Sequence, residues 1–385
     1  MRVTQSMLTN SNLKYISQNY DRLGKIQDQI MSGKKITRPS DDPVVAMKGM
    51  RYRSQVVEVD QFMRNLNEGF NWMDNADAAL DETTQVLHRI RELTVQASND
   101  SYDPEARGNI AKEIEQLQEH IVALANTRVG ENYIFNGTAT DAPAINENKF
   151  SVDFGKFQDD LNNGTVNAED FTFSYKGASF SFSEVDGNGK HVFQSVTGDK
   201  MLFDAASGEV IHSYQEEQKH LNGGTINVEK TINTADLIVS DKKAVSTNTQ
   251  FVNIEVMKGV TIPININAQN TFSIEMFGSL ESIKKMLTNE ETTGAEITKA
   301  LDSIDGFLDD IVSSRAELGA QVNRAEMVQS RLLQQRVVAV KTVSENEDID
   351  FEKAIIDLTT QESLHRAALA AGARIIQPTL MDFLR

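Results

Sequence analysis

The chain has 385 residues, a formal net charge of −18 at pH 7 and no cysteine. This length is enough for two or three domains with a sizeable core. The negative charge argues against nucleic acid as the main partner. The lack of cysteine excludes disulfides, thiolate zinc sites and a cysteine nucleophile.

No part of the sequence looks like a membrane or secretory segment. The residues that follow Met1 lack the apolar region of a cleaved signal. The apolar run Ala367–Ile376 is too short to span a bilayer and carries Arg374. We therefore expect no membrane insertion, and a chain that is cytoplasmic or leaves the cell without a cleaved signal.

Residues 1–37 are predicted to contain one helix after a short lead, and Gly33 marks the position where it should end. Its apolar stripe has heptad spacing and comprises Leu13, Ile16, Tyr20, Leu23 and Ile30. Between Arg2 and Arg53 ten basic residues stand against four acidic ones, so this end is positive on a negative chain. We expect its basic side chains to pair with acidic faces of the C-terminal helix or of neighbouring subunits.

The segment that follows is a helix–loop–helix boundary, formed by Arg38, Pro39, Ser40, Asp41, Asp42 and Pro43. Pro39 favours an extended backbone before it. Asp41 or Asp42 can cap the next helix, and Pro43 suits its first position, where no N–H is needed.

Three further amphipathic stretches predict a helical bundle. One stripe runs from Pro43 to about Ser98, and a shorter one contains Ile110, Ile114, Leu117, Ile121 and Leu124. The third, Ile297–Val343, is a heptad seam interrupted by Arg315, Gln329 and Arg336. Because the first and third stripes have similar lengths, we expect them to pair antiparallel within one molecule.

Between these helices the periodicity changes to that of strands. Phe171, Phe173 and Tyr175 alternate, as do Phe180 and Phe182, with a hairpin turn at residues 176–179. Ile262, Ile264 and Ile266 alternate as well, and Pro263 marks that strand as an edge. The fold class is therefore mainly α, a long antiparallel bundle built from both chain ends with a β-rich insert.

We expect three domains, each defined by residue ranges. Residues 1–42 and 345–385 form a terminal-helix assembly domain, residues 43–145 and 251–344 the long-helix bundle, and residues 146–250 the β-rich outer domain. Tyr133, Ile134 and Phe135 are predicted to open the β region, and a short helix near residues 278–287 leads back to the bundle.

The last forty residues are predicted to form one more amphipathic helix after a break at residues 344–348. Its apolar residues are Ile355, Leu358, Leu369, Ile376, Leu380, Phe383 and Leu384. Two terminal helices alone leave apolar faces open, which cannot offset the entropy of ordering them. We therefore expect both ends to be largely disordered in the monomer and to fold in an assembly, with these residues and the first helix's stripe as the interface.

Several motifs carry a resemblance to a known family. They are the opening Met1–Met7, the loop Gly33–Pro43, Tyr133–Gly137 after Leu124-Ala125-Asn126, Leu318-Gly319-Ala320 with Asn323-Arg324, and Asp348–Pro378. In this order they resemble the flagellin family over about two-thirds of the chain. The Arg-Pro-Ser-Asp-Asp-Pro loop and the Leu-Met-Asp-Phe-Leu ending resemble its hook-associated, hook–filament junction members more than filament flagellins.

This resemblance implies a non-enzymatic structural subunit of an extracellular ring between hook and filament. The implied partners are the chain itself, a second hook-associated junction protein and flagellin. Export through the flagellar type III apparatus is also implied, with a cytoplasmic chaperone holding the C-terminal segment beforehand. No cofactor is implied.

Other interpretations remain open at this point. The nearest is flagellin itself, and a coiled-coil adaptor that stays inside the cell is a further one. An enzyme in the β insert has no catalytic motif to support it. Glu217 and His220 have the spacing of half a di-iron motif, near Glu216 and His212, but such a site needs a second copy that the sequence lacks. His88 and Glu92 share a helix face, where an exposed polar contact is favoured over a metal. We therefore expect no metal site.

Overall fold

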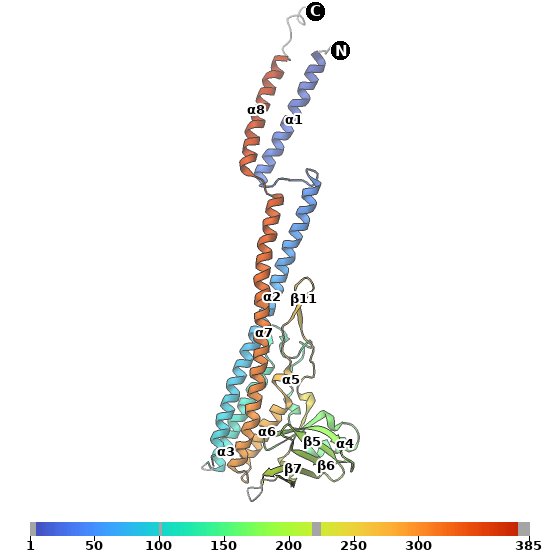
Figure 1. Cartoon of the computed structure of the whole chain (residues 1–385), viewed down its shortest axis with the longest axis vertical. Helices are drawn as coiled ribbons and strands as arrows, with labels where there is room; N and C mark the ends of the chain where they lie inside the picture. Colours follow the sequence, from blue (N-terminus) through green and yellow to red (C-terminus); the bar gives the residue numbers. More distant parts are fainter. Residues whose placement is uncertain (1–4, 100–101, 218–224, 376–385) are drawn as a thin grey trace, which may run out of the picture. The chain divides into compact units, whose positions relative to one another are not determined.

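The structure is a computed structural model that describes residues 5–99, 102–217 and 225–375. The chain forms two compact units (Figure 1). Unit 1 comprises Met1–Met63 and Gln329–Arg385, and unit 2 comprises Arg64–Val328. The long helices α2 and α7 contribute residues to both units.

The helices are α1 (Gln5–Ser32), α2 (Pro43–Ala97), α3 (Pro104–Ala125), α4 (Phe154–Asn162), α5 (Ala268–Thr271), α6 (Ile274–Thr288), α7 (Gly294–Glu347) and α8 (Phe351–Ile375). The strands are β1 (Arg128–Val129), β2 (Asn132–Tyr133), β3 (Phe171–Tyr175), β4 (Ala178–Val185), β5 (His191–Ser195), β6 (Lys200–Phe203), β7 (Val210–Glu217), β8 (Thr225–Ile232), β9 (Ile238–Asp241), β10 (Asn253–Met257) and β11 (Val260–Pro263). These elements confirm the predicted fold class, mainly helical with a β-rich insert.

In unit 1, α1 and α8 pack against each other as an antiparallel pair. The Gln361 side chain donates a hydrogen bond to Asn19 Oδ1 at 3.2 Å, and the rings of Tyr20 and His365 lie 5.9 Å apart. Little of this pair is buried. No described residue of α1 is buried, and in the described part of α8 only Ala354, Gln361 and Gly372 are.

The remainder of unit 1 pairs the first part of α2 with the last part of α7. Val59 of α2 and Leu332 and Ala339 of α7 are buried. Arg336, a predicted interruption of the seam, forms an ion pair with Asp60 at 2.7 Å. The helix α7 extends to Glu347, and the break before α8 is at Asp348, at the end of the segment where the sequence predicts it.

In unit 2, α2, α3 and α7 form the bundle that the stripes predict. Its buried residues follow the heptads and include Leu66, Met73, Leu80 and Leu87 of α2, Ile114 and Ile121 of α3, and Ile304, Ile311 and Leu318 of α7. Arg315 forms ion pairs with Asp77 (3.1 Å) and Asp81 (2.7 Å), and Arg91 contacts Asp305. Because residue numbers rise along α2 as they fall along α7, the two helices are antiparallel, as expected.

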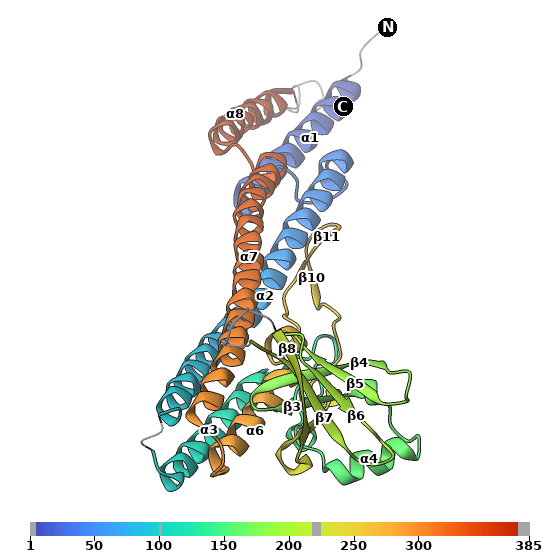
Figure 2. The same cartoon turned by 60° about the horizontal axis from the view of Figure 1, so that its bottom comes forward.

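The β-rich part of unit 2 is a seven-stranded antiparallel sheet in the order β8-β7-β6-β5-β4-β3-β9 (Figure 2). The hairpin between β3 and β4 turns at Lys176 and Gly177, both with positive φ, which is the geometry of a two-residue hairpin turn. The sheet's aromatic core includes Phe173, Phe193 and Phe203, which Phe157 of α4 covers.

The helix α6 packs on β3, β4 and β9. Gly278 permits this close approach, because a Cβ at that position would lie 3.2 Å from Ser240 Oγ and closer still to Ser174. Outside the insert, β10 and β11 form a two-stranded sheet with no further strand among the described residues, in agreement with the edge position predicted from Pro263. This hairpin contacts α2 through a hydrogen bond from Asn65 Nδ2 to Glu255 O at 2.9 Å.

Two local predictions need correction. Tyr133 belongs to the two-residue strand β2, whereas Ile134 and Phe135 lie outside any strand, because the partner strand β1 is itself only two residues long. The helix α4 inside the insert was not expected, since its nine residues are too few to show a clear period. The division into three domains is not tested by these elements and stays a prediction. None of the described helices combines the length and apolar character needed to cross a bilayer.

Candidate assembly surfaces

The loop between α1 and α2 is ordered by its two aspartates. Asp42 Oδ1 accepts hydrogen bonds from the backbone N–H groups of Val44 (3.0 Å) and Val45 (3.1 Å), so it caps α2, and Pro43 is the first helical residue. Both features confirm the predicted boundary. Asp41 accepts from the Arg38 N–H at 3.0 Å and pairs with Lys25 of α1 at 3.3 Å. The Arg38 N–H is the main reason that the pKa of Asp41 lies below its usual value.

A second set of contacts joins this loop to the segment between α7 and α8. Lys34 forms ion pairs with Asp348 at 2.7 Å and with Glu347 at 3.6 Å. The Lys35 N–H donates to Glu347 O at 2.7 Å, and the Ile349 N–H donates to Gly33 O at 3.0 Å. The Lys34–Asp348 hydrogen bond raises the pKa of Lys34 and lowers the pKa of Asp348. Backbone hydrogen bonds and charge therefore tie the end of α1 to the segment that leads into α8.

The predicted stripe of α1 and α8 divides between two environments. Ile16, Leu23, Ile30 and Leu358 are half-buried. Leu13, Tyr20, Ile355 and Leu369 keep 51, 66, 52 and 49% of their surface exposed. These four leave apolar area open to a further partner. Four other predicted interface residues, Ile376, Leu380, Phe383 and Leu384, lie outside the described residues.

Further apolar side chains of the terminal helices are exposed although they lie off the predicted stripe. They are Met7, Tyr15 and Met31 of α1, and Phe351, Ile356 and Leu364 of α8. Heptad spacing identifies one face of a helix, so it misses a second apolar face on the same helix. The α1–α8 pair therefore carries exposed apolar groups on more than one side.

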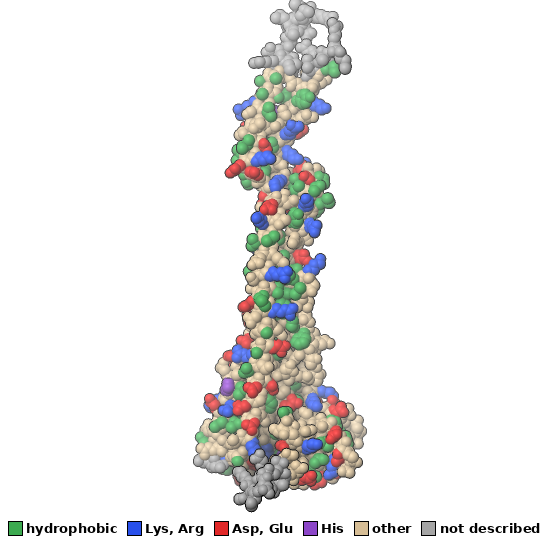
Figure 3. Space-filling view, viewed as in Figure 1, with side chains coloured by type: hydrophobic (Ala, Val, Ile, Leu, Met, Phe, Trp, Pro, Cys, Tyr) green, Lys and Arg blue, Asp and Glu red, His purple; other side chains and the backbone are tan. Residues whose placement is uncertain are grey.

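The part of α2 and α7 that belongs to unit 1 is also apolar on its outside. Val44, Met47, Met50 and Val57 of α2 and Leu333, Val337, Val338 and Val340 of α7 are exposed. Figure 3 shows apolar side chains interspersed with lysine and arginine on the helices of unit 1. Heptad spacing predicts an internal seam along this stretch and misses the exposed residues, because they lie between the seam positions.

The histidine motifs considered for a metal lie only partly within the described residues. Glu216 and Glu217 are the last two residues of strand β7. His220 lies outside the described residues. Glu92 pairs with Arg89 at 3.3 Å. Within residues 5–99, 102–217 and 225–375, no three histidine or acidic side chains lie close enough together to hold a metal ion.

Two models of known protein families match the helical regions at the two ends of the chain. The family model of the bacterial flagellin N-terminal helical region matches residues 3–140, and that of the bacterial flagellin C-terminal helical region matches residues 301–384. Together they cover more than half of the chain, including α2, α3, most of α7 and both terminal helices.

Individual relatives extend over nearly the whole chain at low identity. Flagellin of Clostridium tyrobutyricum is 22% identical and aligns with 98% of this chain and 100% of its own length. Flagellin D of Vibrio cholerae is 27% identical, with 91% of this chain and 90% of the relative aligned.

Among solved structures, a protein assigned as a flagellar hook-associated protein of Vibrio parahaemolyticus superimposes with a TM-score of 0.52. It is 15% identical, and the alignment covers 80% of this chain and all of that one. At this identity the match speaks for a shared fold. On the two family models and the bundle that they cover, the chain belongs to the bacterial flagellin family, the structural proteins of the flagellum.

Proposed function

We propose that this chain is the subunit of the ring that joins the flagellar hook to the filament, and that it assembles through its terminal helices. The observation that carries the proposal is the exposed apolar surface of the α1–α8 pair, on which Leu13, Tyr20, Ile355 and Leu369 are all about half exposed or more. Apolar surface of this kind on paired helices is typical of an interaction site. The subunit would act by joining neighbouring parts of the flagellum, which needs no catalytic group, so the proposed function is non-enzymatic.

Two further observations support the junction position. The loop Arg38–Pro43 and the residues near the C-terminus resemble hook-associated members of the family. The fold match to the assigned hook-associated protein of Vibrio parahaemolyticus covers 80% of this chain. In that position the ring has flagellin on one side and a second junction protein on the other.

Filament flagellin is the second candidate function. It is favoured by the curated relatives, which are named flagellins and align over almost the full length of this chain. Both candidates use the same terminal helices, so they differ in where the subunit sits and in how many copies the flagellum holds.

The two candidates can be separated by labelling flagella at one site. The chain has no cysteine, and Val196 is fully exposed in the turn between β5 and β6, so Val196→Cys provides a single reactive thiol on the β-rich insert. A maleimide dye added to flagella of a strain carrying this variant should mark one point at the base of each filament. Labelling along the whole filament would instead identify a filament subunit. The parent strain without Val196→Cys, treated with the same dye, controls for thiols of other proteins.

The proposal includes the route by which the subunit reaches its position. We propose type III export in an unfolded state, after a cytoplasmic chaperone has held the C-terminal segment. Deleting residues 348–385 should leave the unit 2 bundle folded but abolish incorporation into flagella. It should also abolish co-purification of the chaperone, and a truncated protein that still completes hooks would contradict this assembly route.

A further inference from the structure

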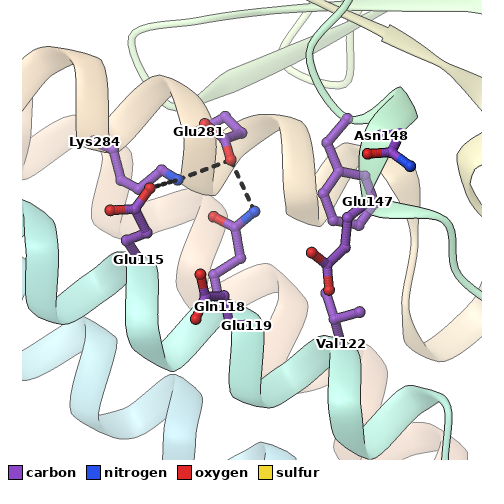
Figure 4. A pocket seen from close by; sticks show the side chains of 9 residues that line it. Glu115, Gln118, Glu119, Val122, Glu147, Asn148, Glu281 and Lys284 are labelled. Atoms are coloured by element: carbon purple, nitrogen blue, oxygen red, sulfur yellow. Dashed lines mark hydrogen bonds and ion pairs between the residues drawn. The ribbon is translucent and has the colours of Figure 1, made fainter.

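A pocket in unit 2 lies between α3, α6 and the short 3-10 helix Glu147–Lys149, far in sequence from the terminal helices. Its volume is about 250 Å³. Its lining residues are Glu115, Gln118, Glu119, Val122, Glu147, Asn148, Phe150, Glu281 and Lys284 (Figure 4). Four carboxylates thus face a single ammonium group, which makes the pocket strongly negative.

Part of this charge is already balanced inside the pocket wall. Lys284 Nζ lies 2.8 Å from Glu281 and 3.7 Å from Glu115. The carboxylates of Glu119 and Glu147 remain, and across the described chain neither has an ion pair or a side-chain hydrogen bond. The pocket therefore presents two uncompensated carboxylates to an incoming ligand.

A buried amide oxygen provides an independent sign of a missing ligand. Gln118 is only 5% exposed, and its Nε2 donates to Glu281 Oε1 at 2.9 Å. This bond sets the orientation of the amide, because a flipped amide would bring two oxygens together. Gln118 Oε1 then has no hydrogen-bond donor among the described residues. Figure 4 shows it pointing away from Glu281, into the space beside Glu115, Lys284 and Glu119.

The opposite wall is apolar. Val122 and Phe150 line it, and Phe150 stacks on Phe277 with ring centroids 4.3 Å apart. A buried acceptor, two carboxylates and a flat apolar wall suit a planar cation with several N–H donors. A guanidinium has these properties and is more weakly hydrated than an ammonium.

We infer that this pocket binds a guanidinium group. Glu119 and Glu147 would pair with its charge, Gln118 Oε1 would accept one of its N–H groups, and Val122 with Phe150 would contact its face. A neighbouring cavity of about 520 Å³ shares Glu115, Glu281 and Lys284 with this pocket. The source is either a small free guanidino compound or an arginine side chain of a second copy.

Binding can be measured on the full-length monomer with methylguanidinium as the probe. In valine-methyl-labelled protein, the Val122 signals should shift and saturate, while those of the distant, exposed Val196 stay in place. Methylammonium at the same ionic strength should bind about tenfold more weakly, since it cannot make the additional charge-assisted hydrogen bonds. Equal responses to the two cations, or no saturation at Val122, would overturn the inference.

Two matched double variants test whether methylguanidinium binding depends on the pocket or only on the negative charge of the whole protein. Glu119→Gln with Glu147→Gln should weaken methylguanidinium binding by about tenfold or more. Glu131→Gln with Glu169→Gln removes the same charge from exposed sites outside the pocket and should leave affinity unchanged. Equal loss in both doubles would reduce the effect to long-range electrostatics and contradict the site. All four residues are exposed, and far-UV circular dichroism checks that the fold is retained.

A second arm identifies the source of the guanidinium. If methylguanidinium slows self-association of the wild type more than methylammonium does, and has no such effect on the Glu119→Gln/Glu147→Gln variant, an arginine of a second copy fills the pocket. If assembly is insensitive while Val122 still saturates, the ligand is a small free compound. Neither result depends on whether the subunit sits in a ring or in a filament.

Discussion

Gly49 of α2 lies directly against the carboxylate of Glu347 at the end of α7. A Cβ at position 49 would overlap Glu347 Oε1 and would lie 3.1 Å from its Cδ. The same carboxylate forms an ion pair at 2.9 Å with Arg53, which lies one turn further along α2. The Glu347 side chain is only 10% exposed. The glycine therefore creates the space in which α2 holds the last residue of α7.

This relationship predicts an unusual response to Gly49→Ala. Replacing glycine by alanine in a helix interior normally raises the free energy of unfolding by about 1 kcal/mol. At position 49 we expect no gain, or a loss of up to about 1 kcal/mol, because the added methyl displaces Glu347 from Arg53. The free energy of unfolding from urea titrations followed by circular dichroism measures the effect.

Gly319→Ala is the matched control for that substitution. Gly319 also lies inside a long helix, α7, but nothing approaches its Cβ position within 4 Å. It should therefore show the ordinary stabilisation of about 1 kcal/mol. An equal gain at position 49 would mean that Glu347 moves away at no cost.

The terminal helices are expected to exchange their amide hydrogens quickly in the monomer. In α1 no described residue is buried, and in α8 only Ala354, Gln361 and Gly372 are, so little apolar burial opposes unfolding of the pair. Hydrogen exchange on the monomer should show weak protection over α1 and α8 and strong protection around Leu80, Ile114 and Ile311 of the bundle. Strong protection at residues 358–375 in the monomer would contradict the prediction that the ends fold on assembly.

Exposed apolar residues of α8 should affect assembly much more than the stability of the monomer. Leu369 is 49% exposed, so Leu369→Ser should leave monomer stability within about 0.5 kcal/mol of the wild type. It should nevertheless reduce incorporation into flagella strongly, because Leu369 is one of the apolar groups proposed to meet a neighbour. Leu364→Ser tests the off-stripe face in the same way.

Val196→Ser is the control for these substitutions, since it removes an exposed apolar side chain from the turn between β5 and β6, outside the proposed interface. It should not change incorporation. If Leu369→Ser and Leu364→Ser also incorporate normally, the exposed face of α8 is not an assembly surface, and the interface must involve other residues.

The β-rich insert should lose stability in mild acid because of two histidines on its inner face. His212 packs among the rings of Tyr175, Phe180 and Tyr214, and His191 packs beside Phe182 and Phe203. Burial lowers the pKa of both rings, against a smaller opposing effect of Asp199 on His212.

The sign of this dependence follows from proton binding. Below about pH 6.5 the unfolded chain binds protons at these rings that the folded chain does not. Stability should therefore be constant above pH 6.5 and should fall as the pH drops from there to the lowered folded-state values. The slope is at most about 1.4 kcal/mol per pH unit for each histidine.

Urea unfolding between pH 7.5 and 5 measures this slope. His191→Phe with His212→Phe should flatten this slope, because neither ring then takes up a proton on unfolding. The double variant would count against the assignment if it unfolded with the wild-type pH dependence.

Much of the secondary structure could be predicted because its causes are local. The caps and turns at Asp42, Pro43 and Gly33 need only their own neighbours in sequence. The heptads of α2, α3 and α7 and the alternation around Phe173 and Phe180 are repeats within single elements. The family resemblance also rests on short motifs of this kind, and the family models confirm it.

Local patterns did not reveal which side chains meet across the fold. Arg315 interrupts the α7 seam in the sequence, but only the antiparallel register shows that it pairs with Asp77 and Asp81. Likewise the exposed faces of α1 and α8 could not be separated from their packed face until the pairing of Asn19 with Gln361 was known.

The sequence by itself determined the helical stripes, the caps, the β-rich insert and the family, since each depends on residues close together in the chain. The tertiary structure alone decided the space at Gly49 for Glu347 and the pocket around Gln118. Both join residues that are more than a hundred positions apart, and their chemistry depends on distances that only the packing of one helix against another can set.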